Sequence, residues 1–413
     1  MHDTMLTASL ISSVMMMAPI KIGIIGYGFS TKCFHLPFIL PNSDFKVHAF
    51  LQRAAPPTAN APAGRWGHCT IDFPQAKHYR TSDDFFADGE IDLVIVCTHT
   101  HEEFVEKALV SGKHVVVEKP FASTSAEAER LMALAKESGK LLTVFQNRRY
   151  DSDFLTVQKL VTEGALGDIV DAEIHFDVPS PTWIAGWTKK EYSPGEGMSF
   201  ALGTHTIDQA LCLFGRPASV TGFFRSNRGV DSDVDDTFTI ILQYSGEQKN
   251  LLVTIKTAIV THMKDQLKYF VRGTKGSFLK VNYTGNCFCY KERDTYFIIV
   301  HQFGTCPQEN KAIAAPGKPA TDPDYGLESE DIWGTLTTTA EFDGSSQKFD
   351  EGSQKYIGKY PSLRGWYRGY YENVAAAING TGAVSVQPET ARDGLKIIEM
   401  AKESHETGRT VAW

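Results

Sequence analysis

The sequence predicts an α/β domain with a doubly wound parallel sheet, followed by an α+β domain with an open, mostly antiparallel sheet. In the first half of the chain, short apolar runs alternate with helical patterns, as is typical of buried parallel strands joined by crossover helices. In the second half the runs lengthen and alternate in polarity, and helices follow near the C-terminus. A chain of 413 residues also exceeds what one core usually supports, so two domains are expected.

The first domain is expected to span residues 18–147. Its predicted strands are Ile20–Ile25, Lys46–Leu51, Leu93–Cys97, Val115–Val117 and Leu141–Phe145. Two predicted helices, 102–110 and 125–138, are each followed closely by a glycine, Gly112 or Gly139, which suits a left-handed C-cap. The Pro- and Ala-rich stretch 54–67 is predicted to be a surface loop.

The second domain is expected to span residues 148–413. Its predicted strands are Ile169–Phe176, Val220–Phe224, Thr237–Tyr244, Leu251–Ala258 and Lys268–Gly273. Residues 1–17 are expected to be a disordered leader, or sequence upstream of a start at Met17, because they lack the basic start and the small-residue cleavage site of a secretory signal.

Composition excludes several classes of function. Hydrophobic residues make up 42% and charged residues 22%, which is ordinary for a globular protein. The net charge of −8, without a concentrated basic face, argues against nucleic-acid binding, and no apolar run is long enough to cross a membrane. The seven cysteines are dispersed, with one C-x-C at Cys287 and Cys289 and no second pair, so we predict no metal site and a reducing cytoplasm.

A glycine turn follows the first predicted strand. Gly26 permits a tight turn, and Gly28 lets the backbone approach a pyrophosphate. A helix predicted to begin near Ser30 then offers unpaired N–H groups and a positive dipole end. Thr31 stands where a third glycine is usual. The position after the first strand favours a dinucleotide-binding Rossmann domain over a purely structural turn.

The end of the second strand favours NADP over NAD. NAD binding requires a carboxylate there to accept from the ribose 2′-hydroxyl, but the chain continues Leu51-Gln52-Arg53. Arg53 is instead suited to a 2′-phosphate. The alternative is that Arg53 is a solvated loop cation.

Val115–Val117 ends in Glu118-Lys119-Pro120, at the sheet edge where doubly wound proteins bind ligands. A lysine there can contact a reacting oxygen. The alternative is an ordinary strand exit.

Together, these elements resemble the glucose–fructose oxidoreductase / inositol 2-dehydrogenase / MocA family, from about residue 18 to the C-terminus. The segments that carry the resemblance are Ile22–Ser30, Glu118–Pro120, Gln146–Asp151 and Gly203–Gln209. The Asn-Arg-Arg-aromatic-Asp element looks like the subgroup that contains an NADP-dependent scyllo-inositol dehydrogenase and fungal oxidoreductases. The resemblance implies hydride exchange at a hydroxyl-bearing carbon of a sugar or cyclic polyol, in a homodimer or larger oligomer that pairs through the second sheet.

The resemblance also implies roles for individual residues. Lys119 would hold the reacting oxygen, and a neutral His205 would exchange the hydroxyl proton. The expected cofactor-binding residues are Gly26, Gly28, Phe29, Ser30, Arg53, Thr98, His101, Glu118 and Asn147, and the expected substrate residues are Arg148, Asp208 and Trp183. The alternatives are a structural histidine at 205 and a salt-bridged hinge at Arg148-Arg149.

The sequence departs from this family's pattern at two points. Ala201 stands four residues before His205, where the family usually has an aspartate that orients the imidazole. Asp208 is a possible substitute. The segment 177–183 replaces the usual arginines or tyrosines, so the substrate pocket is rebuilt around a different set of residues that includes Trp183. A cofactor-binding regulator without turnover and an NAD-assisted glycosidase are therefore alternative functions, and Arg53 counts against the glycosidase.

Residues 281–302 match nothing in the family pattern and interrupt a predicted strand. One hypothesis is a retained intron, because a Val codon begins with GT and one Gln codon ends in AG. The alternative is a genuine hairpin, supported by the apolar run Tyr296–Val300. A peptide from within this segment, recovered from the native protein, would exclude the intron.

Overall fold

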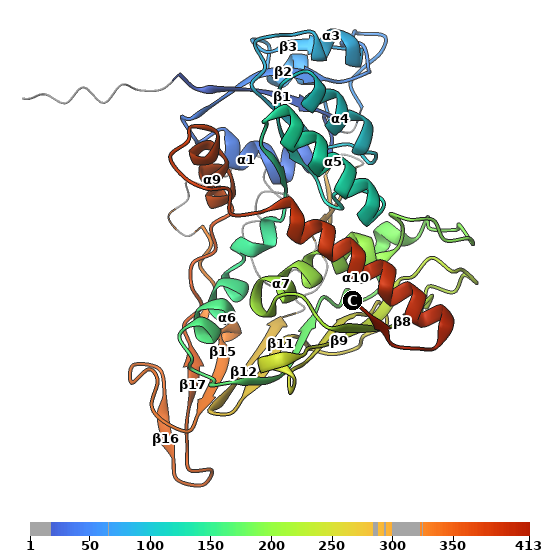
Figure 1. Ribbon diagram of the computed structural model, residues 1–413. Coiled ribbons are helices and arrows are strands. Elements are labelled where there is room, and N and C mark those ends of the chain that lie inside the picture. The colour runs from blue at the N-terminus through green and yellow to red at the C-terminus, as the bar shows by residue number, and fades with distance from the viewer. Residues whose placement is uncertain (1–17, 65, 284–287, 293–294, 300–322, 324) are drawn as a thin grey trace, which may run out of the picture.

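Two large β-sheets, each with helices packed on it, account for most of the described chain (Figure 1). The structure is a computed structural model that describes residues 18–64, 66–283, 288–292, 295–299, 323 and 325–413. The predicted leader, residues 1–17, lies outside the described residues. None of the helices in the described ranges combines the length and the apolar character needed to cross a membrane.

The first sheet has six parallel strands in the order β3-β2-β1-β4-β5-β6. The strands are β1 Ile20–Ile25, β2 Phe45–Leu51, β3 Lys77–Tyr79, β4 Leu93–Val96, β5 His114–Val117 and β6 Leu142–Val144. Its helices include α2 Cys69–Asp72, α3 Ser82–Phe86, α4 Glu102–Val110 and α5 Ser125–Ser138. The order reverses between β1 and β4, which opens a crevice at the carboxyl ends of these strands.

The five predicted strands of this sheet are confirmed to within a residue or two, and so are helices α4 and α5. Gly139 follows α5 with a φ of +64°, the left-handed cap that the sequence predicts. The sixth strand, β3, was not predicted, because its three half-exposed residues carry no apolar run.

The helix after the glycine turn begins near Ser30, as predicted, but it is not a regular α-helix. Its π-helical part is η1 Thr31–His35, which continues into the short α1 Leu36–Ile39. The Thr31 hydroxyl donates to the carbonyl of Gly26 at 3.0 Å, and Pro37 has no N–H to continue a regular hydrogen-bond ladder. Thr31 at the start of η1 and Pro37 just after it therefore account for the wider, π-helical turn.

The second sheet has ten strands in the order β16-β17-β15-β12-β11-β7-β10-β9-β8-β18, and only the β7–β10 pair is parallel among the described strands. These strands are β7 Ile169–His175, β8 Ser219–Arg225, β9 Thr237–Gln243, β10 Leu252–Thr257, β11 Asp265–Gly273, β12 Gly276–Tyr283, β15 Gly334–Thr338, β16 Lys348–Asp350, β17 Lys355–Tyr360 and β18 Val411–Ala412. An open, mostly antiparallel sheet is thus confirmed.

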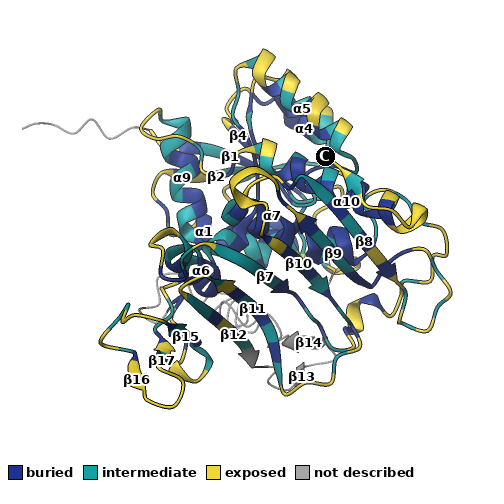
Figure 2. Cartoon of the chain, turned by 60° about the horizontal axis from the view of Figure 1, so that its bottom comes forward, coloured by how far each residue is buried: buried dark blue, intermediate teal, exposed yellow. Residues whose placement is uncertain are grey.

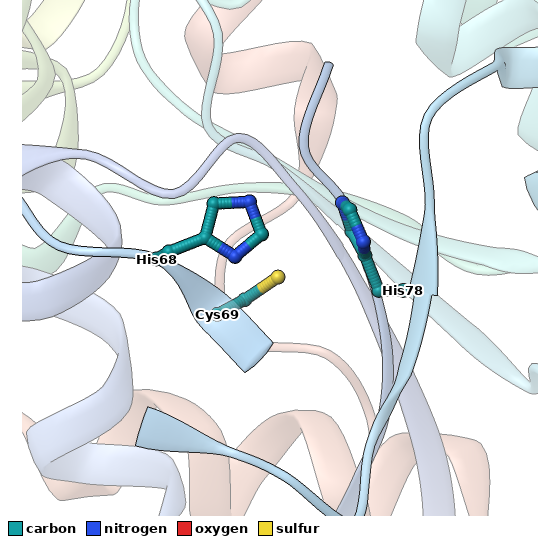
Figure 3. A group of neighbouring side chains, drawn as sticks. All are labelled: His68, Cys69 and His78. Atoms are coloured by element: carbon teal, nitrogen blue, oxygen red, sulfur yellow. The ribbon is translucent and has the colours of Figure 1, made fainter. Parts of the chain in front are cut away.

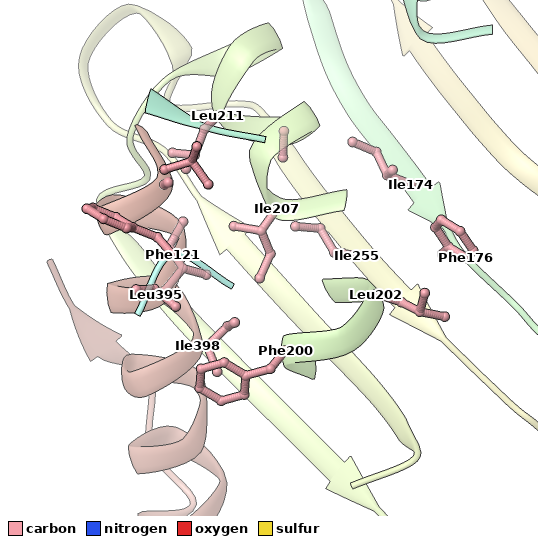
Figure 4. Packing of buried hydrophobic residues seen from close by; sticks show 14 of the residues in the cluster. Phe121, Ile174, Phe176, Phe200, Leu202, Ile207, Leu211, Ile255, Leu395 and Ile398 are labelled. Carbon is pink, nitrogen blue, oxygen red and sulfur yellow. The ribbon is translucent and has the colours of Figure 1, made fainter. Parts of the chain in front are cut away.

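Helices α7 and α10 pack on one face of this sheet (Figure 1). The helices and turns of this half are α6 Ser152–Thr162, α7 Thr204–Phe214, α9 Arg368–Ile378, α10 Pro388–Thr407, η2 Asn147–Tyr150, η3 Thr182–Ile184, η4 Ser199–Gly203, η5 Gly246–Gln248 and η7 Glu330–Ile332. In Figure 4, Ile207 and Leu211 of α7 lie between Leu395 of α10 and Ile255 of β10. Buried residues alternate with less buried ones along much of β9, as the colours in Figure 2 show.

The chain after α6 does not stay with the second sheet. Tyr367, Tyr370 and Tyr371, in and next to α9, join a buried cluster with Ile22 and Phe145 of the first domain. Helix α10 in turn contacts α5 and β6 as well as β8 and α7. The predicted boundary after residue 147 separates the two sheets, but the C-terminal helices pack against both.

The unmatched segment 281–302 begins inside a strand. Val281 belongs to β12 and pairs with Leu267, and the strand ends at Tyr283 opposite Asp265. Within the described residues, β13 Phe288–Glu292 and β14 Thr295–Ile299 form a separate antiparallel pair. The choice between a retained intron and a native hairpin stays a prediction for peptide mapping.

Gly222 marks the closest approach of β8 to α10. A Cβ atom placed there would lie 2.2 Å from the backbone oxygen of Ala401, so Gly222→Ala must push α10 away from the sheet. We expect a loss of about 1–3 kcal/mol in the free energy of unfolding. Thermal denaturation measures it. Gly186→Ala is the control, because a Cβ there meets no atom within 4 Å. Equal stability of the two variants would contradict this packing.

Candidate functional site

The glycine turn after β1 has the geometry that a pyrophosphate needs. Gly26 has a φ of +94°, and a Cβ there would lie 3.1 Å from the carbonyl oxygen of Cys97, so only glycine fits. A Cβ placed on Gly28 meets no atom within 4 Å. The space over Gly28 is thus open at the carboxyl edge of β1 and β4, where a dinucleotide lies in this sheet order. Both predicted glycines fit a bound dinucleotide.

Two aromatic rings flank this turn. Phe29, predicted to contact the cofactor, is partly exposed and packs edge-on against Phe34 with ring centroids 5.1 Å apart. The Trp66 ring lies 5.4 Å from Phe29, and its carbonyl accepts a hydrogen bond from Lys32 at 3.0 Å. Trp66, which was not predicted, places a second ring beside the open turn.

A buried ion pair lies beneath the turn. The Glu118 carboxylate accepts hydrogen bonds from the Ser30 hydroxyl and, at 3.0 Å, from His35 Nε2. His35 Nδ1 donates to the hydroxyl oxygen of Tyr371 at 2.5 Å. Ser30 and Glu118, both predicted to bind the cofactor, are therefore bonded to each other and fix the turn to the end of β5.

Both members of this pair are charged at neutral pH. Burial disfavours charge on His35, but Cys97 and Glu118 outweigh it and raise its pKa to about 10. Burial likewise opposes the Glu118 carboxylate, but His35, Lys119 and Ser30 lower its pKa to about 2. The contact of His35 with Tyr371 could not be predicted from the sequence. His35 lies in a helical turn that carries no recognisable motif, and Tyr371 is 336 residues further along the chain.

The end of β2 carries no acid in the structure. Arg53 is exposed, and among the described residues its side chain has no hydrogen bond or ion pair. Its carbonyl accepts from Arg80 Nε at 3.2 Å, so a second exposed arginine lies beside it. Arg80 was not predicted as a site residue. It follows β3, a strand that the sequence pattern did not indicate.

Three side chains next to Arg53 converge as metal ligands would (Figure 3). The ligand atoms of His68, Cys69 and His78 lie within 4.8 Å of one another. However, His68 Nδ1 accepts from the N–H of Thr70, its Nε2 donates to Ala54, and His78 Nε2 donates to Gln52. Burial also raises the pKa of Cys69 to about 11, so its thiol stays protonated.

The described residues thus offer three ligands, whereas a structural zinc site has four. The observed hydrogen bonds of this group join the 52–54 and 68–70 segments to β3 instead. They hold the loop that carries Arg53.

Lys119 lies at the carboxyl end of β5, as predicted. Its Nζ donates to the carbonyl oxygen of Ala201 at 2.8 Å, which brings the strand end to the turn before α7. The Lys119–Pro120 peptide bond is cis. Buried His101 donates from Nδ1 to the carbonyl of Pro120 at 2.7 Å, and burial lowers the pKa of His101, so it stays neutral. His101, predicted to bind the cofactor, holds this turn in place.

Thr98 and Asn147 lie at the same edge of the sheet. Thr98 comes after β4, and its methyl group would lie 3.5 Å from a Cβ placed on Gly26. Its hydroxyl donates to the carbonyl of Thr100. Asn147 is buried and begins η2, the turn that follows β6. Both positions agree with the predicted cofactor side of the crevice.

His205 is buried in the first turn of α7, with its ring stacked 6.4 Å from that of Phe176. Burial, then the positive charges of Lys119, Arg148 and Lys268, lower the pKa of His205 well below its usual value. Its Nδ1 is buried and has no hydrogen-bond partner among the described residues. The imidazole is therefore neutral.

The side chain of Ala201 has no acceptor for Nδ1 of His205. It lies in η4, a π-helix with a wider turn than the α-helical spacing assumed from sequence. Position 201 therefore leaves Nδ1 of His205 without a partner from its side chain.

The structure corrects the role expected of Asp208. Its two oxygens accept from Nε and Nη2 of Arg149 at 2.7 and 2.6 Å, while Arg149 Nη1 donates to the carbonyl of Ser385. Asp208 therefore does not orient His205, and its carboxylate is committed to Arg149. Residues i and i+3 share a helix face, but the stronger attraction of a facing guanidinium decides where the carboxylate points.

The two consecutive arginines have different environments. Arg149 makes the salt-bridged contact foreseen as the structural alternative. Arg148 is buried beside the site, with its Nη1 3.3 Å from Asp151 and its guanidinium carbon 5.0 Å from the centre of the Phe176 ring. Trp183, also predicted for the substrate, lies in η3, partly exposed, with its ring against Trp187.

The structure adds Lys268 to the residues around His205. Lys268 is buried in β11, with Nζ 4.6 Å from the centre of the Phe176 ring. The sequence pattern placed it at the start of a strand and indicated no role. Regular alternation would turn it away from its buried neighbour Tyr269.

Comparisons with known proteins agree with this geometry. Residues 20–146 match the family model described as an oxidoreductase family with an NAD-binding Rossmann fold, and residues 154–279 match the GFO/IDH/MocA C-terminal domain. The uncharacterized oxidoreductase C115.03 of Schizosaccharomyces pombe is 33% identical over 402 residues, which cover 96% of this chain and 100% of that protein.

One further relative and two solved structures, all from Bacillus species, extend the likeness. The scyllo-inositol 2-dehydrogenase (NADP(+)) IolW of Bacillus subtilis is 32% identical over 95% of both chains. The structure of YvaA from Bacillus subtilis superposes with a TM-score of 0.77 at 30% identity, over 96% of this chain and 99% of that one. An oxidoreductase from Bacillus cereus gives 0.75 at 27% identity, over 95% and 98%. On its folded geometry and on these matches, the chain belongs to the Gfo/Idh/MocA family of oxidoreductases.

Proposed function

We propose that the protein is an NADP(H)-dependent oxidoreductase that transfers hydride to or from a hydroxyl-bearing carbon of a sugar or cyclic polyol. The observation that carries this proposal is the meeting of Lys119 and His205 at the carboxyl edge of the glycine-turn sheet, joined through Ala201. Relatives named as inositol, scyllo-inositol and glucoside dehydrogenases support the substrate class.

The site residues divide the chemistry between them. A bound nicotinamide supplies the hydride donor or acceptor. The Lys119 ammonium donates to the reacting oxygen and stabilises the negative charge that develops there. His205 takes the hydroxyl proton at Nε2, since Nδ1 is buried, and its lowered pKa keeps it in the neutral, accepting form.

Two arginines support NADP as the cofactor. Arg53 and Arg80 lie together beyond β2, both exposed, and the residue at the strand end is Gln52 rather than an acid. A phosphate on the adenosine ribose suits such a pair, because guanidinium groups bind phosphate in a bidentate manner. The name of IolW, an NADP(+) enzyme, points the same way.

A second candidate function is a cofactor-binding regulator, or a weakly active paralogue. The specific observation in its favour is the orphaned Nδ1 of His205 beside Ala201. Without an acceptor at Nδ1, no hydrogen bond selects the tautomer that leaves Nε2 free to accept a proton. Turnover on a polyol panel separates the two candidates.

We also propose a homo-oligomer in the cytoplasm. Phe223, Leu252 and Leu279 are exposed apolar residues on three strands of the second sheet, as a sheet face that pairs with another copy requires. Cys33, Cys69, Cys97 and Cys212 are free thiols, which suits a reducing compartment.

Replacing Lys119 tests the proposed reaction. We expect Lys119→Met to lower kcat/KM about 10²- to 10³-fold, because one charge-stabilising donor is lost. NADPH affinity, measured by fluorescence titration, should change little. The exposed Lys190 provides a control, Lys190→Met, with unchanged turnover. Full turnover in Lys119→Met would remove Lys119 from the mechanism.

Restoring the missing carboxylate tests the assignment of His205. We expect Ala201→Asp to raise the pKa of His205 by about 1–3 units, because a nearby negative charge favours the imidazolium. Alcohol oxidation needs the neutral ring, so the acid limb of the kcat/KM profile should move to higher pH. Oxidation well above that limb should become faster, since an acceptor at Nδ1 leaves Nε2 free to accept. Ala201→Asn, which adds no charge, is the control, and an unmoved acid limb in Ala201→Asp would argue against His205 as the base.

Cofactor selectivity rests on Arg53. Since a hydrogen bond to a charged group contributes about 1.5–3 kcal/mol, Arg53→Ala should weaken NADPH binding about ten- to hundredfold and leave NADH binding unchanged. Fluorescence titration of both nucleotides measures this. The exposed Arg409, changed to Ala, serves as the control. An equal loss for both nucleotides would contradict a 2′-phosphate contact.

A further inference from the structure

A bulge in β11 directs Lys268 toward the site. Leu267 pairs with Val281 of β12 and Tyr269 with Lys280, so Lys268 is an extra residue without a partner across the strand pair. Such a bulge re-aims a side chain and lets two consecutive residues share a face. The Tyr269 hydroxyl donates to Gln209 of α7 at 2.8 Å, which identifies the shared face as the one beneath α7.

Three site residues surround the ring of Phe176, which follows β7. Lys268 Nζ lies 4.6 Å from the ring centre, the Arg148 guanidinium carbon 5.0 Å and the His205 ring centroid 6.4 Å. Two cations and the acid–base histidine are thus gathered within one small volume. Phe176 gives this volume an apolar wall, which is visible beside Leu202 and Ile174 in Figure 4.

The Lys268 ammonium has no hydrogen-bond acceptor or ion-pair partner within 4.0 Å in the described parts of the chain, although only 2% of the residue is exposed. Lysines are almost never buried without a partner, because the lost hydration is not replaced. Among the acids nearby, Asp153 has the strongest electrostatic interaction with Lys268. Asp153 Oδ2 is also buried without a hydrogen-bond partner among the described residues. The two charges therefore attract each other without making an ion pair.

The other acids nearby are bonded elsewhere. Asp151 accepts from Arg148 and from the Tyr367 hydroxyl. Asp177 accepts from the N–H of Ala258 and contacts His175. Burial raises the pKa of Asp153 and lowers that of Lys268, while each charge favours the other. None of these three acids forms a hydrogen bond with the Lys268 ammonium in the described parts of the chain.

We propose that Lys268, with Arg148 beside it, receives a carboxylate of the substrate, and that the substrate class is a sugar acid, an aldonate or uronate, rather than a neutral polyol. A carboxylate supplies the acceptor that the buried ammonium lacks, in a charge-assisted hydrogen bond. A neutral hydroxyl would accept more weakly. This inference rests on the proposed function, because it assigns the substrate of the same site.

Binding of matched sugars tests the assignment. With NADP⁺ bound, calorimetric Kd values are measured for D-glucuronate and D-gluconate, and for D-glucose and scyllo-inositol as neutral analogues. We expect the wild-type protein to bind the acids at least about tenfold more tightly, as a charged hydrogen bond implies. Lys268→Met, similar in volume but uncharged, should abolish that preference, and Lys268→Arg should keep it.

The control is Lys256→Met, which removes a lysine of β10 that is paired with Glu173 and should keep the preference. NADPH binding, measured by fluorescence titration, verifies that each variant is folded. Equal binding of acids and neutral sugars, no binding of the acids, or a preference that survives in Lys268→Met each overturns the inference. Hydride transfer to a neutral polyol would leave the proposed dehydrogenase intact, whereas failure of the wild-type protein to bind NADPH would overturn the proposed function itself.

Discussion

The buried ion pair of Glu118 and His35 is the contact on which the site geometry depends. It joins three separate parts of the chain: the helix after the glycine turn, the strand end that carries Lys119, and, through Tyr371, helix α9. The pair stays ionised because each partner stabilises the other's charge against the cost of burial. The ion pair therefore helps to fix the glycine turn relative to the strand end that carries Lys119.

Positive charge dominates the surroundings of His205. Its ring lies among Lys119, Arg148 and Lys268, and its buried Nδ1 has no hydrogen-bond partner among the described residues. Positive surroundings weaken an imidazole as a base and favour a nearby anion. In the proposed reaction, these cations would stabilise negative charge on the substrate oxygen more than they would help His205 to accept a proton.

Much of the fold and part of the site could be predicted from sequence. The apolar runs, the glycine turn and the Glu-Lys-Pro strand end carry local signals, and they predict the turn at Gly26 and the position of Lys119 just after a strand. The partners of the polar residues could not be predicted, because burial and long-range pairing decide them.

Three particular residues show why. Asp208 faces a guanidinium that precedes it by 59 residues rather than the nearby His205. One extra residue in β11 reverses the side on which Lys268 lies. The pKa of His35 is raised because the fold brings Cys97 and Glu118 to it.

Helix α10 links the two halves of the molecule mechanically. Its Glu399 accepts hydrogen bonds from the N–H and hydroxyl of Ser125 at the start of α5, while Ala401 lies against Gly222 of β8. A hinge rotation that separated the two sheets would have to break these contacts together. We therefore expect the two sheets to keep their distance when a ligand binds.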